Sequence, residues 1–329
     1  MSARAAGPCP QRRSGGFSVT VLLALRAHGL RELLTAVPAL RALHDVRPRH
    51  RLVLAAPGWL RPVVELADCV DELHATPMAG GLRWNAPPPA FAVNLHDAGA
   101  DSIRALLATD PEQTITFRHK DFPQLPGALC EPGLHETVRW CRLLEWAGIA
   151  ADPARLDLTP PPESTGERRW IVVYPGGAPA RRWPAERFAT VAAGLREWGY
   201  PVRVVGSAAD RPLARGVAEA AGLPENSVLA GELTLRQLAV TVADAALVLS
   251  GDTGVGHLAT AFGTPSVLVF GPDSPAVWGP PPERMAHVAL WAGHVGDPRS
   301  DAPAPGLAMI SAAEVLAAAD RQLSSQVRV

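Results

Sequence analysis

The residues best suited to chemistry lie at 250–257, where the chain reads Ser-Gly-Asp-Thr-Gly-Val-Gly-His. Residues 246–249 form an apolar run typical of a buried strand, and residues 255–262 have the pattern of a helix. The start of a helix offers unpaired backbone N–H groups and the positive end of the dipole, which favours a phosphate site. The residues predicted to contribute are Asp252, Thr253, Gly254 and His257. A lone histidine such as His257 could instead belong to the core.

A second candidate segment follows the predicted strand 170–174, where residues 175–184 read PGGAPARRWP. Gly176 and Gly177 would let the backbone approach a ligand closely. Arg181 and its neighbour could pair with phosphate oxygens, or could form a solvated surface. We predict that Gly176, Gly177 and Arg181 bind the same ligand as the first segment.

A third candidate is the loop 206–210, GSAAD, which follows the predicted strand 201–205. The Asp210 carboxylate could accept hydrogen bonds from a ribose or a base, or could cap the helix that follows. Because the carboxyl ends of parallel strands meet at one edge of a sheet, the three segments together predict a site for a nucleotide diphosphate. The sequence from Gly254 to Ala259 also fits GxGxxA, but that fingerprint belongs after the first strand of its domain, which argues against NAD or FAD.

The elements that must position these loops alternate between strand and helix patterns in two halves of the chain. This alternation predicts two parallel sheets covered by helices. A Pro-rich break at residues 158–167, LTPPPESTGE, separates the halves. After residue 270 we expect irregular structure, then a last helix whose capping box is Ser311 and Glu314. The predicted boundaries are a disordered leader at 1–16, a first domain at 17–160, a linker at 161–168, a second domain at 169–310 and a C-terminal helix at 311–329.

Composition narrows the class of protein. The 329 residues suffice for two domains, and 47% hydrophobic with 19% charged residues is typical of a globular protein. A net charge of −1 argues against a general nucleic-acid binder. The four cysteines show no CxxC and no metal-ligand spacing, so we expect neither a metal site nor disulfides, and a reduced cytoplasmic chain. No apolar run reaches the roughly 18 residues that a membrane span needs.

A larger pattern now connects these segments. The motif Asp252-Thr253-Gly254-x-x-His257-Leu258-Ala259, with FGTP at 262–265 and FGP at 270–272 behind it, resembles the signature of glycosyltransferase family 9. That family contains the heptosyltransferases that extend lipopolysaccharide cores from ADP-heptose. The resemblance includes residues 175–184, 206–210, 232–235 (ELTL) and 38–43 (PALRAL), and covers nearly the whole chain after residue 17.

The resemblance implies an α/β enzyme of the GT-B class, in which two Rossmann-like domains with parallel sheets face a central cleft. The donor nucleotide would bind the C-terminal domain and the acceptor the N-terminal one, with inversion and without a metal ion, and the chain contains no DxD motif. By position in the motifs, Asp252, Thr253, Gly254 and His257 would hold the donor sugar and phosphates, Arg181 a phosphate, Asp210 the nucleoside, and Leu233 would flank the adenine.

The acceptor side departs from the family pattern. Six to seven residues before Pro38, where the family has Gly-Asp, this chain has Arg31 and Glu32. The family's aspartate is its proposed general base, and Glu32 could take that role or simply occupy the first turn of a helix. Arg31 adds bulk there and could pair with Glu32 and lower its pKa. His96 or Asp97, at the end of the predicted strand 91–95, could substitute as the base or contact the acceptor.

Three functions therefore remain open. The first is an inverting, metal-independent glycosyltransferase with a nucleotide-sugar donor and no other cofactor, whose acceptor is a glycan, a glycolipid or a small molecule. A cytoplasmic enzyme at the membrane surface would suit a lipid-linked acceptor. The second is a nucleotide-sugar-binding GT-B protein with weak or no transfer activity, a partner subunit, because Arg31 and Glu32 are altered. The third is a nucleotide-sugar epimerase or hydrolase.

Overall fold

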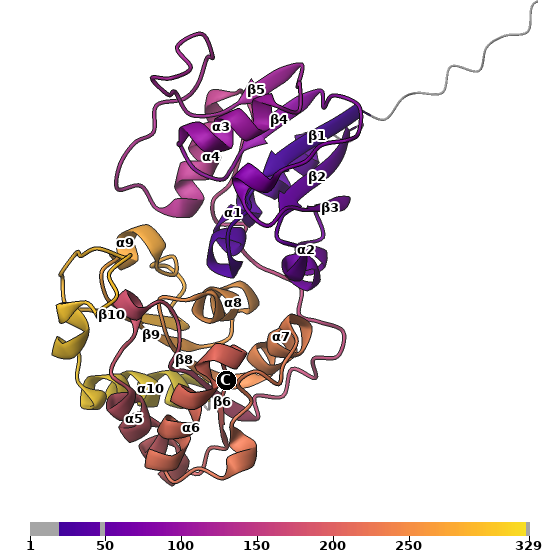
Figure 1. The fold of residues 1–329 in the computed structure, drawn as a ribbon. Coiled ribbons are helices and arrows are strands. Elements are labelled where there is room, and N and C mark those ends of the chain that lie inside the picture. Colours follow the sequence, from indigo (N-terminus) through magenta and orange to yellow (C-terminus); the bar gives the residue numbers. More distant parts are fainter. Residues whose placement is uncertain (1–19, 47–49, 327–329) are drawn as a thin grey trace, which may run out of the picture.

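The chain folds into two α/β domains, which lie one above the other in Figure 1. The computed structural model describes residues 20–46 and 50–326, and the predicted leader at 1–16 lies outside them. Every strand pair within the two described sheets is parallel. The predicted fold class is therefore confirmed.

The first domain is built on a five-stranded sheet with strand order β3-β2-β1-β4-β5. Its strands are β1 (Thr20–Leu25), β2 (His50–Ala56), β3 (Glu72–Ala75), β4 (Phe91–Asn94) and β5 (Gln113–Ile115). Its helices are α1 (Leu30–Val46), α2 (Arg61–Ala67), α3 (Ala100–Leu107) and α4 (Glu136–Trp146). The strand order reverses between β1 and β4, and ligands bind parallel sheets at such a switch point, beyond the carboxyl ends of the strands.

The second domain has a five-stranded sheet in the order β10-β9-β8-β6-β7, so its switch point lies between β6 and β8. Its strands are β6 (Trp170–Tyr174), β7 (Val202–Val204), β8 (Ala245–Gly251), β9 (Ser266–Phe270) and β10 (His287–Trp291). Its helices are α5 (Ala185–Glu197), α6 (Arg211–Ala220), α7 (Leu235–Ala243), α8 (Gly254–Phe262), α9 (Pro275–Trp278) and α10 (Ala312–Gln326). Central strand β8 is buried along its whole length because β6 and β9 flank it.

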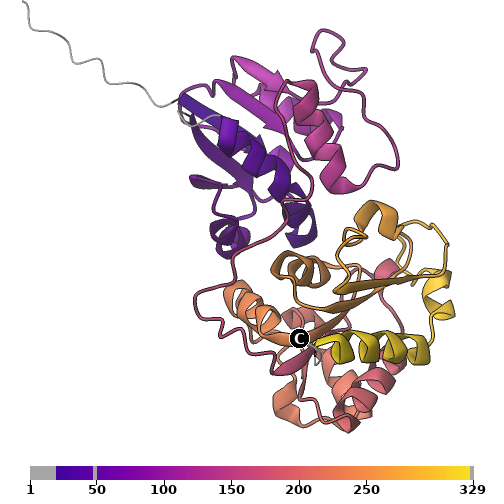
Figure 2. The ribbon, with the colours of Figure 1, turned by 180° about the vertical axis from the view of Figure 1, so that it is seen from behind.

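The structure corrects the predicted elements at three places. The segment after residue 270, expected to be irregular, contains α9 and the edge strand β10, whose half-buried residues give only a weak apolar signal. Strand β3 was not predicted, and beside β7 a single bridge joins Val204 to Val228. Helix α10 packs on α5 and so belongs to the second domain (Figure 2), and its capping box is confirmed by the Ser311 N–H donating to Glu314 at 2.8 Å.

The segment between the domains is tied to the second domain. The N–H of Leu158 donates to the carbonyl of Ala261, and the residues from Ser164 to Gly166 donate to the Asp244 carboxylate. Cys69, Cys130 and Cys141, the cysteines within the described ranges, are all free thiols. No helix in the described part of the chain is both long and apolar enough to cross a membrane.

The two domains meet where α1 packs against α8 (Figure 1). A Cβ atom at Gly254, the first residue of α8, would lie 2.8 Å from the Cβ of Leu30, the first residue of α1. Only glycine allows this close approach. The N-terminus of each helix is thereby brought to the same point between the domains.

Candidate active site between the two domains

A cavity of about 510 Å³ lies between the domains, where the carboxyl ends of β6 and β8 face the start of α1. It contains both sides of the predicted site, since Arg31 and Glu32 of the first domain line it opposite Asp252 of the second. Of the predicted donor residues, those that line the cavity are Gly177, Arg181, Leu233, Asp252, Thr253 and Gly254.

The N-terminus of α8 forms one wall of this cavity, which Thr253, Gly254 and Val255 line. Thr253 precedes the helix, but its side chain bonds to Ser250 at 2.7 Å and makes no cap to the helix N–H groups. Gly177 lies opposite with a φ of +108°, a conformation that favours glycine, and a Cβ there would lie 3.0 Å from Thr253. Uncapped N–H groups beside a close backbone turn are well suited to a phosphate.

An ionic cluster crosses the cavity between the domains. The Arg31 guanidinium contacts Asp252 Oδ2 at 2.6 Å and Glu32 Oε1 at 3.0 Å, and its Cζ atom lies 3.7 Å from the ring centre of Trp278. Arg181 binds Asp273 through two nitrogens, at 2.6 and 2.8 Å, and lies 3.3 Å from the same Asp252 oxygen. Both arginines are therefore neutralised by carboxylates in the chain without a ligand.

These contacts shift the pKa values of the two central carboxyls. Burial alone would raise the pKa of Asp252, whose side chain is 1% exposed, but the contact with His257 and the charge of Arg31 outweigh burial and lower it. Burial likewise opposes ionisation of Glu32, but the neighbouring Arg31 guanidinium lowers its pKa below the usual carboxyl range. The predicted pairing of Arg31 with Glu32 is thus confirmed. Glu32 is a carboxylate at neutral pH.

Part of the cavity wall is apolar. Leu233 lies there as predicted, together with Leu235 and Leu238 of the following helix. Trp59 of the first domain and Tyr174 of the second also line the cavity. Flat apolar and aromatic walls of this kind suit the ring of a nucleobase.

Asp210 has a structural role in the loop 206–210. Its carboxylate accepts from the N–H and the hydroxyl of Ser207, at 2.9 and 2.7 Å, which forms a capping box before α6. Gly176 packs directly against it, since a Cβ at Gly176 would lie 2.6 Å from Asp210 Oδ1. Neither residue lines the cavity. Asp210 is the N-cap residue of α6, but its carboxylate accepts no N–H of that helix, so the predicted cap on the following helix is not formed. A contact of Asp210 with the nucleoside stays a prediction.

His257 and Arg182 lie behind the cavity wall. His257 Nε2 is 3.5 Å from Asp252 Oδ1, and its imidazole ring lies edge-on to Trp278. Arg182 donates to the carbonyl of Gly177 at 2.8 Å and so supports the glycine turn instead of facing a ligand. His257 is thus placed to orient Asp252, and a direct contact between His257 and the donor stays a prediction.

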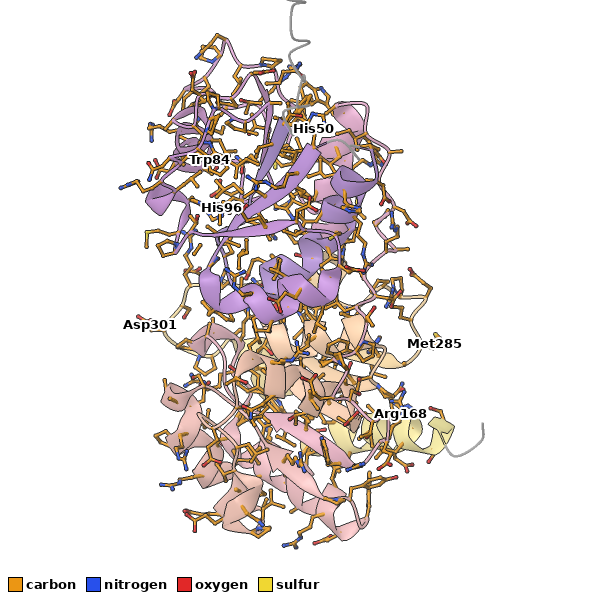
Figure 3. The ribbon with its side chains drawn as sticks, turned by 90° about the vertical axis from the view of Figure 1, so that its right-hand side faces the viewer. His50, Trp84, His96, Arg168, Met285 and Asp301 are labelled. Carbon is orange, nitrogen blue, oxygen red and sulfur yellow. The ribbon has the colours of Figure 1, made fainter. Side chains whose placement is uncertain are left out.

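A second cavity, of about 230 Å³, opens in the first domain beside Glu32. His96 and Asp97, both predicted at the end of a strand, line it together with His28. His96, labelled in Figure 3, is nearly buried, and burial together with His28 lowers its pKa to about 4, so the imidazole is neutral at neutral pH. Glu32 lines this cavity as well as the cavity between the domains, so its carboxylate is shared by the two.

Sequence reasoning missed several residues that shape the site. Asp273 and Trp278 follow β9, and His28 follows β1, so the position after a strand's carboxyl end could have indicated all three. Trp59 belongs to η1 (Gly58–Leu60), a short 3-10 helix after β2, and its aromatic side chain there was the available signal. The ion pairs between Arg31 and the second domain have no signal in the sequence, because they depend on how the domains pack.

Two parallel-sheet domains facing a central site are found in solved structures of similar shape. A family 9 glycosyl transferase from Veillonella parvula has a TM-score of 0.78 at 20% identity, with 95% of this chain and 100% of that chain covered. An ADP-heptose lipopolysaccharide heptosyltransferase II from E. coli has a TM-score of 0.75 at 20% identity, with 93% and 99% covered. The chain therefore has the GT-B fold.

The sequence comparisons identify the family. The model of glycosyltransferase family 9 (heptosyltransferase) matches residues 148–298. Lipopolysaccharide heptosyltransferase 2 of Salmonella typhimurium is 31% identical over 294 residues, which cover 77% of this chain and 83% of that protein. Lipooligosaccharide heptosyltransferase 2 of Haemophilus influenzae is 33% identical over 137 residues, and there the chain spans only 39% of the relative. The chain belongs to glycosyltransferase family 9.

Proposed function

We propose that this chain transfers a heptose from ADP-heptose to an acceptor hydroxyl, with inversion and without a metal ion at the diphosphate. The observation that carries the proposal is that Glu32 lines both the cavity between the domains and the cavity of the first domain. A base between a donor cavity and an acceptor cavity can take a proton from an acceptor hydroxyl as that oxygen attacks the anomeric carbon. The bond from the anomeric carbon to the diphosphate breaks, and ADP leaves.

Two features support binding of the leaving diphosphate. The uncapped N-terminus of α8 and the guanidinium of Arg181 both face the cavity between the domains. Asp273 holds Arg181 in the chain without a ligand, so a diphosphate would replace this carboxylate on the arginine. Preorganised donors of this kind stabilise charge on a leaving group without a cation.

The identity of the donor is supported by the relatives and by the apolar end of the cavity. A solved E. coli heptosyltransferase with ADP has a TM-score of 0.68 to this chain, and lipopolysaccharide heptosyltransferase 2 of Salmonella typhimurium is similar along most of its length. Leu233, Tyr174 and Trp59 offer the apolar surface that an adenine needs. The acceptor would be a glycan or glycolipid, modified on the cytoplasmic side of a membrane.

Calorimetry with ADP and a transfer assay with ADP-heptose test this proposal. Arg181→Met should weaken ADP binding about 10- to 100-fold, because it removes a charge-assisted contact to phosphate. Arg236→Met is the matched control. Arg236 belongs to α7 and forms a surface ion pair with Glu163, which lies between the domains in the sequence. We expect the control to bind ADP like the unmodified chain. Equal ADP binding by both variants would show that the diphosphate does not bind Arg181.

Replacing Arg31 should move the pH dependence of transfer. Because Arg31 lowers the pKa of Glu32, Arg31→Met should raise this pKa, and Glu32 would then lose its negative charge at a higher pH. The acidic limb of the pH–rate profile should therefore shift upward, while replacing the exposed Arg104 leaves it in place. An unmoved acidic limb would mean that the group titrating there is not Glu32.

Arg31 also favours a second candidate, a nucleotide-sugar-binding protein without transfer activity. The side chain of Arg31 lies between Glu32 and Asp252, in the region where an acceptor oxygen would meet the donor sugar. This candidate predicts ADP binding that depends on Arg181 and no transfer to any acceptor. Recovery of transfer in an Arg31→Gly variant would identify Arg31 as the group that prevents it.

A further inference from the structure

We propose that His28, His96 and Asp97 form a binding site for a divalent transition-metal ion of the Zn²⁺ class, beside Glu32 on the acceptor side. This site goes beyond the proposed function, because the diphosphate chemistry described above relies on arginine and a helix N-terminus. The first-domain cavity is a place where two imidazoles and a carboxylate meet.

The topology of the first sheet brings the three side chains together. His28 follows β1, whereas His96 and Asp97 follow β4, and these strands are neighbours in the sheet. One ligand atom from each residue lies within 4.8 Å of the others. The two imidazole rings are parallel, with centres 3.6 Å apart. Tetrahedral zinc with bonds of about 2.0–2.1 Å separates its ligand atoms by about 3.4 Å, so binding requires the three side chains to close in. It also requires the imidazole rings to turn out of their parallel stack, because a ring nitrogen binds a metal in the plane of its ring.

The carboxylate of Asp97 is held in place by a second layer of hydrogen bonds. Its Oδ1 accepts from the Gly99 N–H at 2.8 Å and from the Ser102 hydroxyl at 2.5 Å, and the amide of Asn94 donates to Ser102 at 2.9 Å. This arrangement leaves Oδ2 facing His96 Nε2, 3.9 Å away. Fixed outer partners of this kind orient carboxylate ligands in metal sites.

His96 is held equally firmly and is short of a partner. The buried Arg26 guanidinium donates to the carbonyl of His96 at 3.1 Å and to that of Leu95 at 2.5 Å, which fixes the backbone. The His96 side chain is only 8% exposed, yet its Nδ1 makes no hydrogen bond. The nitrogen that faces Asp97 is the other one, Nε2, so we place the ion at Nε2 and leave Nδ1 outside the metal site.

The surroundings specify the class of ion. Two imidazole nitrogens and one carboxylate suit Zn²⁺ and similar divalent ions, whereas Mg²⁺ and Ca²⁺ prefer oxygen ligands. In the same cavity Arg26 and Arg139 both lie beside Glu136, and Glu32 is already paired with Arg31. Within the described ranges, the Asp97 carboxylate forms no ion pair with an arginine, so its charge remains available to a cation. The cavity volume of about 230 Å³ leaves room for a water or an acceptor oxygen as a further ligand.

The site can be tested without donor or acceptor. A chelator first removes any bound metal from the full chain, and zinc binding is then measured. Calorimetry and elemental analysis after desalting should give one zinc ion per chain. His28→Ala and His96→Ala should each abolish this stoichiometric binding, and Ser102→Ala should weaken it about 10- to 100-fold. His119→Ala is the matched control, because His119 also faces a carboxylate, Asp121, at 3.9 Å but has no second histidine partner. It should keep the full zinc stoichiometry.

Two results would overturn the proposal. One is zinc binding by the unmodified chain that is no tighter or more stoichiometric than binding by His28→Ala. The other is a stoichiometric zinc ion that both histidine variants retain. His28→Gln, which keeps a polar side chain of similar size, replaces His28→Ala if circular dichroism shows that the alanine variant is unfolded. The readout here is metal content, so a chain that transfers no heptose could still bind zinc. Likewise, a chain that binds no zinc could still transfer heptose.

Discussion

Glu32→Gln is expected to lower the rate of heptose transfer by about 100- to 10,000-fold, the usual contribution of a general base. The amide keeps the size of the side chain but cannot accept the proton of the acceptor hydroxyl. ADP binding should be unchanged, because the predicted diphosphate contacts come from Arg181 and the start of α8. Steady-state transfer kinetics and calorimetry with ADP, measured on the same preparation, separate the two effects.

Glu65→Gln provides the control, since Glu65 is an exposed carboxylate of α2 in the same domain. Its transfer rate should equal that of the unmodified chain. The unmodified rate itself should stay level through neutral pH and fall only below the usual carboxyl range, because the pKa of Glu32 is lowered. Full activity of the Glu32→Gln variant would show that Glu32 is not the general base. His96 and Asp97, which line the same first-domain cavity and can also accept a proton, would then be the next candidates.

Glu136→Gln should lower the free energy of unfolding by about 3–5 kcal/mol, as expected when one member of a buried ion pair is removed. Glu136 lies 3.6 Å from Arg26, and both side chains are less than 5% exposed. Burial lowers the pKa of Arg26 to about 10 even though Glu136 raises it. Without Glu136, the Arg26 charge would remain buried with only carbonyl and hydroxyl acceptors in hydrogen-bond contact.

Urea unfolding followed by the tryptophan fluorescence and circular dichroism of the chain measures this loss. Asp101→Asn is the matched control, because the Asp101–Arg104 pair is fully on the surface and should contribute at most about 1 kcal/mol. Equal losses in the two variants would mean that Arg26 does not depend on Glu136. The Glu136→Gln variant should also have a lower transfer rate. Arg26 donates to the carbonyl of Glu32 at 2.8 Å and so helps to position the start of α1.

The packing of Arg26 also explains why the two cavities meet at Glu32. The guanidinium joins the end of β1, the end of β4 and the first turn of α1, and it lies 4.6 Å from the ring centre of Trp140 in α4. It therefore fixes the region that carries His96 on one side and Glu32 on the other. A buried arginine with this many acceptors has a positioning role.

The sequence by itself determined the fold and the donor side of the site. Apolar runs of strand length alternating with helical periodicity predict parallel sheets, and glycines or helix-start residues after β6 and β8 predict where a phosphate would bind. These signals are local, because a pair of glycines after one strand and a helix start after another can be recognised from neighbouring residues alone. The positive φ of Gly177 and the missing side-chain cap at Thr253, whose hydroxyl bonds to Ser250, came only from the structure. The edge strand β10 escaped because half-buried edge strands have weak apolar patterns.

Only the tertiary structure decided the acceptor side. Arg31 and Glu32 are adjacent in the chain, but the pKa of Glu32 also depends on Arg26, and Arg31 is held by Asp252 and Trp278 of the other domain. The stacking of His28 on His96 likewise depends on β1 lying beside β4. Ion pairs and ring stacking need the groups to lie within a few ångströms of each other, so they depend on distances between segments that are far apart in the sequence. Domain packing sets those distances, which is why residue types and spacing could propose Glu32 but could not show what surrounds it.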